Sequence, residues 1–194
     1  MRIIAGEARS RIIEAPKGLD TRPTLDRVRE NLFNIIGAQV RGARVLDLFA
    51  GSGALSLEAL SRGAAFAVMA DIQRAASQCE RQNAERLGFL ERTRILNCSW
   101  QQALKKLAGE GERFDLIFLD PPYAMSGLDQ VTEALVSVCG KDALLVTEHR
   151  AGQPYPVADG WRCVDQRKYG YAGLSMYRRG DEADAQDRPV RGQL

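Results

Sequence analysis

Apolar runs and amphipathic stretches follow one another in a regular order along most of this chain. Short apolar runs, which predict buried strands, lie at 44–49, 66–71, 93–97, 114–119 and 143–148. Residues with helical spacing fill the intervals, at 53–62, from 75 to about 87, from about 97 to 107 and at 128–138. This order predicts repeated βαβ units, and therefore a parallel sheet covered by helices.

The two ends of the chain have different patterns. Near the N-terminus, Ile3-Ile4 and Ile12-Ile13 flank a polar tip, which predicts a short β-hairpin. An amphipathic helix follows, with Thr24 as its expected N-cap and apolar residues recurring to Ile36. Residues 161–169 and 174–179 predict two strands joined by a glycine-containing turn, a terminal hairpin added to the sheet.

The whole pattern predicts an α/β fold with a seven-stranded, mostly parallel sheet of the Rossmann-like kind and an antiparallel C-terminal hairpin. We expect three parts: an N-terminal hairpin and helix at 1–40, an α/β domain at 41–179 and a tail at 180–194. The tail has few apolar residues and is predicted to be disordered.

A glycine turn between the first strand and its helix is the first candidate ligand site. The segment 44–60 reads RVLDLFAGSGALSLEAL, in which Gly51 and Gly53 allow a sharp turn and close approach of a ligand. A third glycine, typical of nicotinamide and flavin sites, is replaced by Ser56. Asp47 repels a diphosphate and favours a cationic ligand such as S-adenosylmethionine. A purely structural glycine turn remains an alternative at this point.

Acidic residues end two further strands. Asp71 follows the second apolar run and lies 20 residues after Gly51, the spacing of the acid that binds ribose hydroxyls in nucleotide-binding α/β folds. Asp120 follows the fourth run and begins the sequence Asp-Pro-Pro-Tyr. Because open α/β sheets bind ligands at the carboxyl ends of their strands, Asp47, Asp71 and Asp120 are expected at one rim.

The Asp-Pro-Pro-Tyr sequence is the strongest chemical motif. Its prolines fix the backbone directly after a strand, so the Asp120 carboxylate and the Pro121 carbonyl become rigid acceptors. Two such acceptors can hold the exocyclic amine of a purine with its lone pair facing an electrophile, while Tyr123 stacks on the base. The alternative is a strand terminator, Pro121-Pro122, with a tyrosine in the core.

Composition narrows the class of protein. The apolar content of 45% and charged content of 27% are ordinary for a globular protein, and the net charge of +2 does not by itself predict nucleic-acid binding. Basic residues nevertheless outnumber acidic ones at 2–29 and 162–179. Four cysteines without a paired spacing and a single histidine, His149, make a zinc site improbable and favour structural roles. No apolar leader or span is evident, and we expect a cytoplasmic protein.

Together these motifs resemble one family. The segments RIIAGEARSR, RPTLDRVRENLFNII, LDLFAGSGALSLEALSRGA, LDPPY and KYG resemble the bacterial 16S rRNA guanine-N2-methyltransferases of the RsmD type, over roughly residues 2–178. The resemblance implies a class I methyltransferase that transfers a methyl group from S-adenosylmethionine to 16S rRNA and releases S-adenosylhomocysteine. It further implies a monomer acting on the small ribosomal subunit or an assembly intermediate, without a membrane partner.

The resemblance also assigns residues. The implied target-base site consists of Asp120, Pro121, Pro122 and Tyr123. The implied cofactor site consists of Asp47, Phe49, Ala50, Gly51, Gly53, Asp71, Ile72, Ser99 and Trp100. The implied RNA contacts are Arg9, Arg11, Arg22, Thr24 and Arg27.

The chain departs from the family pattern at three positions. Asp71 stands where Glu is usual, Ser99 stands near the place of an acid that binds the adenine amine, and Ala5 replaces one of two hairpin glycines. Three other functions stay open: amino-methylation of adenine N6 in DNA or RNA, a non-catalytic RNA-binding assembly factor, and a small-molecule methyltransferase.

Overall fold

The protein is described by a computed structural model, which covers residues 1–16 and 23–180. Its seven strands are β1 (Arg44–Asp47), β2 (Phe66–Asp71), β3 (Thr93–Asn97), β4 (Phe114–Leu119), β5 (Cys139–Arg150), β6 (Trp161–Tyr169) and β7 (Ala172–Arg179). Its helices are α1 (Pro23–Ile36), α2 (Ala54–Ser61), α3 (Arg74–Leu87), α4 (Trp100–Gly109) and α5 (Leu128–Leu135). Single 3₁₀ turns lie at Gly37–Gln39, Leu90–Arg92 and Val136–Val138.

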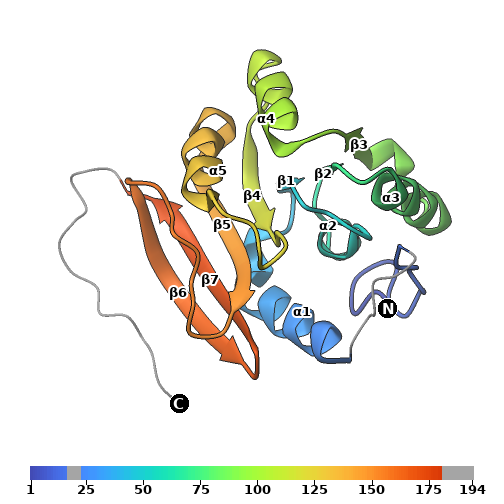
Figure 1. Ribbon diagram of the computed structural model, residues 1–194. Coiled ribbons are helices and arrows are strands. Elements are labelled where there is room, and N and C mark those ends of the chain that lie inside the picture. The colour runs from blue at the N-terminus through green and yellow to red at the C-terminus, as the bar shows by residue number, and fades with distance from the viewer. Residues whose placement is uncertain (17–22, 181–194) are drawn as a thin grey trace.

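The strands form one sheet in the order β3-β2-β1-β4-β5-β7-β6. The first five are parallel, while β7 pairs antiparallel with β5 and β6 (Figure 1). The predicted seven-stranded, mostly parallel sheet with an antiparallel terminal hairpin is thus confirmed. The chain leaves β1 toward β2 on one side and later returns to β4 on the other, which creates a crevice at the carboxyl ends of β1 and β4.

Helices cover both faces of the sheet. Residues alternate along each strand, so that Val45 packs on the side of α1, α2 and α3 and Leu46 packs on the side of α4 and α5. Val28 and Leu32 of α1 belong to the first core, together with Phe118 of β4. Because side chains two residues apart point to the same face, this alternation determines which side chains at the ends of the strands face α1.

The N-terminal segment packs on α2 as a short, irregular hairpin. Its two arms pair through one antiparallel bridge, Arg2 to Ile12, with the Ile3 N–H donating to the Arg11 carbonyl and the Ile13 N–H donating to the Met1 carbonyl. The fully buried Glu58 of α2 accepts the N–H groups of Ile4 and Ala5 at 2.8 and 3.1 Å. Ser61 accepts the N–H of Ala8 at 3.0 Å. Because the side chains of Glu58 and Ser61 take these N–H groups, the pairing does not extend into a regular ladder.

Most predicted boundaries agree with the structure within a few residues. Strand β1 ends at Asp47 instead of residue 49, and β5 runs from Cys139 to Arg150 instead of from 143 to 148. The extension of β5 follows from its pairing with both β4 and β7. The division into domains stays a prediction, and the predicted tail lies outside the described residues, except for Gly180.

Candidate active site

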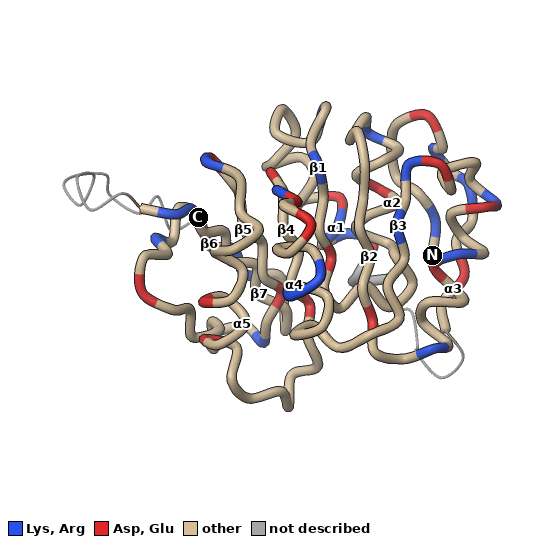
Figure 2. The backbone as a smooth tube through the Cα atoms, turned by 90° about the horizontal axis from the view of Figure 1, so that it is seen from above, with Lys and Arg blue, Asp and Glu red and all other residues tan. Residues whose placement is uncertain are grey.

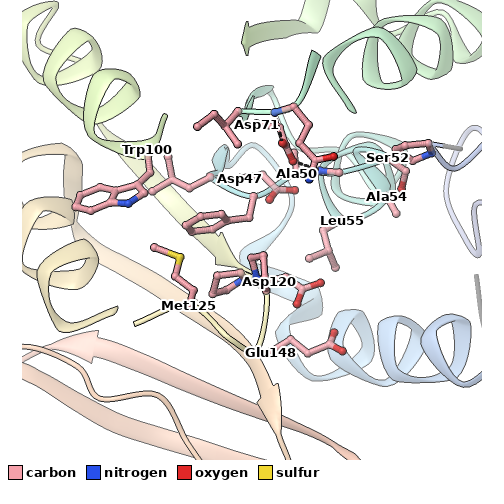
Figure 3. Close-up of a pocket in the computed structure, with 18 of the residues that line it drawn as sticks. Asp47, Ala50, Ser52, Ala54, Leu55, Asp71, Trp100, Asp120, Met125 and Glu148 are labelled. Carbon is pink, nitrogen blue, oxygen red and sulfur yellow. Dashed lines mark hydrogen bonds between the residues drawn. The ribbon is translucent and has the colours of Figure 1, made fainter. Parts of the chain in front are cut away.

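A cavity of about 830 Å³ opens at the carboxyl ends of the central strands. Most of the predicted cofactor and base residues line it: Asp47, Phe49, Ala50, Gly51, Asp71, Ile72, Ser99, Trp100, Asp120, Pro121, Pro122 and Tyr123. Figure 3 shows Asp47, Asp71 and Asp120 around this one space. The sequence motifs that lie far apart in the chain therefore meet at a single site.

The glycine turn approaches the cavity through Gly51. Its φ of +57° lies in the left-handed region, and an added Cβ would meet no atom within 4 Å, so this position is open to a ligand. Gly53 has a φ of +77°, and a Cβ there would lie 2.8 Å from Met69 Sδ of β2. Gly53 does not line the cavity and instead lets α2 begin close to the sheet.

Asp71 holds the turn in place. One carboxylate oxygen accepts the N–H of Gly51 at 3.0 Å, and the other accepts the N–H of Gln73 at 2.8 Å (Figure 3). Each oxygen keeps a second lone pair for hydroxyl donors of a ligand. The shorter Asp side chain is therefore sufficient to link the ends of β1 and β2.

Asp47 is a buried acid that lines the cavity and lacks a full set of partners. Its Oδ2 accepts the Ser56 hydroxyl at 3.2 Å, whereas Oδ1 has no hydrogen bond. Burial, and next the charge of Asp71, raise the pKa of Asp47 to about 7 despite the Ser56 hydrogen bond. An unpaired carboxylate oxygen beside the open Gly51 fits a cationic group such as the ammonium of S-adenosylmethionine.

Glu80 of α3 is a second buried acid that the motif analysis did not single out. Neither carboxylate oxygen has a hydrogen bond among the described residues. Burial, followed by the charges of Asp47 and Asp71, raises its pKa to about 8. A carboxylate on the buried stripe of a predicted helix, one turn from Ala76 and from Asn83, was the signal available in the sequence.

Aromatic and aliphatic side chains line the wall of the cavity at the start of α4. Ile72 is 72% exposed, and Trp100 borders the same space. Ser99 caps α4, accepting the N–H of Gln102 at 3.3 Å while the Gln102 side chain accepts the Ser99 N–H. The hydroxyl of Ser99 is thus engaged in a capping box, and the aromatic and aliphatic walls suit an adenine ring.

The Asp-Pro-Pro-Tyr turn follows β4 directly. The Pro121 carbonyl accepts the hydroxyl of Tyr155 at 3.2 Å and keeps its second lone pair free. The Tyr123 ring is 52% exposed, and the Arg150 guanidinium lies 6.0 Å from its centroid. The guanidinium thus lies over one face of the ring, and about half of the Tyr123 surface stays open to a stacking partner.

Asp120 lines the cavity and is exposed to solvent through it. Burial raises its pKa well above the ordinary value, with further increases from the charges of Glu148 and Asp47. Glu148 of β5 lines the same cavity, and burial raises its pKa as well. Sequence reasoning missed Glu148 because only the sheet order places β5 beside β4.

Three of the expected RNA-binding residues, Arg9, Arg11 and Arg27, lie outside the cavity. Arg9 and Arg27 are exposed, whereas the Arg11 guanidinium donates to the carbonyls of Arg86 and Leu87 at the end of α3. Arg22 lies outside the described residues, as does the Thr24 side chain. Figure 2 shows basic positions interspersed with acidic ones near the N-terminal segment and α3.

His149 is buried between β5 and β7. Its Nε2 lies 2.8 Å from the Ser175 hydroxyl and its Nδ1 lies 2.9 Å from the Arg150 carbonyl. Both nitrogens therefore have protein partners, which favours a structural role. Within 1–16 and 23–180, no cluster of His, Cys, Asp and Glu is arranged to hold a metal ion, and no helix is long and apolar enough to cross a membrane.

Known proteins share this sequence and fold. The family model described as "Conserved hypothetical protein 95" matches residues 1–178. The putative rRNA methyltransferase YlbH of Bacillus subtilis is 34% identical over 186 residues, covering 92% of this chain and 99% of the relative. Ribosomal RNA small subunit methyltransferase D of Escherichia coli K12 is 35% identical over 184 residues, covering 92% and 90%.

Solved structures agree with these relatives. The putative methyltransferase yhhF of Escherichia coli superposes with a TM-score of 0.79 at 35% identity, covering 92% of this chain and 97% of that one. The putative methylase HI0767 of Haemophilus influenzae gives a TM-score of 0.74 at 27% identity, with coverages of 93% and 98%. The fold is the predicted Rossmann-like class I methyltransferase fold. The chain therefore belongs to the family described as conserved hypothetical protein 95, which it shares with ribosomal RNA small subunit methyltransferase D.

Proposed function

We propose that this chain transfers a methyl group from S-adenosylmethionine to the exocyclic N2 amine of a guanine in 16S rRNA. One observation carries the proposal: the glycine turn with Asp47 and the Asp-Pro-Pro-Tyr turn open into the same cavity. The relatives named as small subunit rRNA methyltransferases support the substrate class.

The cofactor half of the cavity holds the donor. Asp47 faces its cationic end, Asp71 accepts from its ribose hydroxyls, and Ile72 and Trp100 flank its adenine. When bound, S-adenosylmethionine supplies an electrophilic methyl group on a sulfonium and leaves as S-adenosylhomocysteine. The apolar walls exclude water, which strengthens the attraction between Asp47 and a cation.

The other half orients the nucleophile. Asp120 and the Pro121 carbonyl accept hydrogen bonds from the N2 amine and direct its lone pair toward the methyl group, while Tyr123 stacks on a guanine turned out of its helix. The new bond joins N2 to the methyl carbon, and the C–S electron pair stays on sulfur. Positioning of this kind contributes roughly 7–11 kcal/mol to catalysis. Asp120 then accepts the proton that the methylated amine loses, which its raised pKa permits.

We further propose that the enzyme is a cytoplasmic monomer that acts on the small ribosomal subunit or an assembly intermediate. Exposed Arg9 and Arg27, with Arg22 and Thr24, contact RNA phosphates near the entrance. Arg11 contributes by fixing the N-terminal loop on α3.

Product analysis tests the function. The protein is incubated with radiolabelled S-adenosylmethionine and small subunits from a strain that lacks the enzyme, in parallel with free 16S rRNA and duplex DNA. Mass spectrometry of nucleosides is expected to find N2-methylguanosine from the ribosomal substrates only. N6-methyladenosine, transfer to DNA, or cofactor binding without transfer would each replace the proposal with one of its alternatives.

A further inference from the structure

Glu148 and Asp120 occupy equivalent positions on neighbouring strands. The parallel register pairs Leu119 of β4 with Thr147 of β5. Asp120 directly follows Leu119, and Glu148 directly follows Thr147. Asp120 lies two residues after Phe118, and Glu148 lies two residues after Val146. Since side chains alternate between the two faces of a sheet, both acids point to the α1 side, on which Phe118 and Val146 pack. Figure 3 shows both carboxylates directed to that side of the cavity.

The two carboxylates lack partners from the protein. Neither makes a hydrogen bond or an ion pair within the part of the chain that the structure describes. Apolar side chains line the same cavity, among them Leu32 of α1 and Leu55 of α2, and Leu174 of β7 is the residue paired with Glu148. Two adjacent acceptors that no protein group occupies can bind a ligand with two neighbouring N–H groups.

Among the described residues, Arg29 is the one basic side chain on the cavity lining, and its terminal nitrogens already have protein partners. Arg29 of α1 donates to the carbonyl of Arg2 at 2.6 Å and to Asp26 at 3.1 Å, and its Nε lies 3.9 Å from the Glu58 carboxylate. Arg29 therefore serves to hold α1 against the N-terminal loop and α2. The carboxylate of Glu148 is left available to a ligand.

Guanine and adenine differ at the atom beside the reacting amine. Guanine carries N1–H next to its N2 amine, so that one edge presents two adjacent donors. Adenine carries an unprotonated N1 next to its N6 amine, and the lone pair of that nitrogen repels a carboxylate. We propose that Glu148 accepts a hydrogen bond from N1–H of the target guanine while Asp120 binds its N2 amine, which makes Glu148 a determinant of guanine specificity. This inference rests on the proposed function.

An analogue isolates the N1–H contact. 2,6-Diaminopurine keeps the N2 amine but has an acceptor at N1. Small subunits are reconstituted with either guanine or 2,6-diaminopurine at the target position, after mass spectrometry has located it. The rates of N2 methylation on the two substrates are compared for the wild type, Glu148→Gln and the control Glu133→Gln, whose side chain is exposed on α5.

The wild type is expected to favour guanine by about 100-fold or more, because diaminopurine leaves the Glu148 carboxylate facing a lone pair. The glutamine amide accepts from N1–H through its oxygen or donates to an N1 acceptor through its nitrogen. Glu148→Gln is therefore expected to lower the preference at least 10-fold, while Glu133→Gln leaves it unchanged. The two bases also differ at C6, where guanine carries an oxygen and diaminopurine an amine, but this difference is the same for the wild type and both variants. A change in the ratio of the two rates between enzymes therefore reports on the contact at N1.

An unchanged preference in Glu148→Gln would overturn the inference while N2-methylguanosine formation by the wild type upholds the proposed function. Formation of another product by the wild type would refute the proposed function itself, and the inference with it. Calorimetric binding of S-adenosylmethionine checks that the variant is folded. If Glu148→Gln does not fold, Glu148→Ala, which removes the acceptor, is compared in the same way and decides by the same criterion.

Discussion

At the scale of single residues, Asp47 and Glu80 are the two acids that the fold buries with too few donors. Asp47 borders the cavity, so a bound cation can neutralise it, whereas Glu80 lies beneath the glycine turn at 0% exposure. Their mutual repulsion adds to the effect of burial on the pKa of Glu80. The protein therefore keeps a strained acidic cluster beside its donor site.

This cluster makes stability depend on pH. The folded pKa of Glu80 is about 8, above its ordinary 4.5, so the folded state binds more protons in this window. Stability from this group is therefore present below about pH 4.5 and lost as the pH rises toward about 8. In Glu80→Gln the difference in the free energy of unfolding, variant minus wild type, should grow between these limits by up to about 1.4 kcal/mol per pH unit.

Urea denaturation at several pH values measures this difference. A constant cost of burying the amide shifts the whole curve but not its slope. Glu85→Gln, exposed on the same helix, is the matched control and should run parallel to the wild type. A Glu80→Gln curve that also runs parallel would contradict the account.

Sequence could predict only some of these residues. Asp47, Asp71 and Asp120 each end an apolar run, and the rule that ligands bind at the carboxyl ends of strands places them together. Glu148 also ends a strand, but its neighbour on the sheet is set by strand order, which the sequence pattern does not specify. Glu80 required knowledge of how α3 packs on the glycine turn.

At the scale of elements, the glycine turn shows two different uses of one residue type. Gly51 faces open space in the cavity, and Gly53 faces Met69 in the core, although both have left-handed φ angles. The sequence assigned both to the ligand because the motif does not distinguish them. The structure separates approach of a ligand from packing of α2 on β2.

A pair of alanine variants tests this separation. Gly53→Ala combines the left-handed strain, about 1–2 kcal/mol, with a contact at 2.8 Å to Met69 Sδ, so it should lower stability the more. Gly51→Ala bears the same kind of strain without the clash but places a methyl group beside the donor. It should weaken S-adenosylmethionine binding the more.

Chemical denaturation and calorimetry report the two effects for each variant. The expected result is opposite rankings in stability and in affinity. The same ranking in both measurements would show that the two glycines do not differ in role.

Element prediction was least accurate where side chains take over backbone hydrogen bonds. The N-terminal residues have strand-like apolar pairs, yet Glu58 and Ser61 bind their N–H groups and leave a single bridge. These partners lie more than 50 positions along the chain from the loop. No local pattern contains that information.

At the scale of the whole molecule, the fold was predictable because apolar runs and helical stretches alternate so regularly. The terminal hairpin was predictable because the spacing of apolar residues changes after β5. What the pattern lacked was the order of strands, β3-β2-β1-β4-β5-β7-β6, which brings the donor half and the base half of the site to one crevice. The central claim is that these halves have separate tasks.

The most direct test compares Asp120→Ala with the wild type in two measurements: the dissociation constant of S-adenosylmethionine and the single-turnover rate of methyl transfer to small subunits. Asp159→Ala, in an exposed loop, is the control. Asp120→Ala should bind S-adenosylmethionine about as tightly as the wild type, because Asp120 belongs to the base half of the cavity, and should transfer about 100-fold more slowly. Near-normal transfer by Asp120→Ala, with cofactor binding intact, would contradict the account.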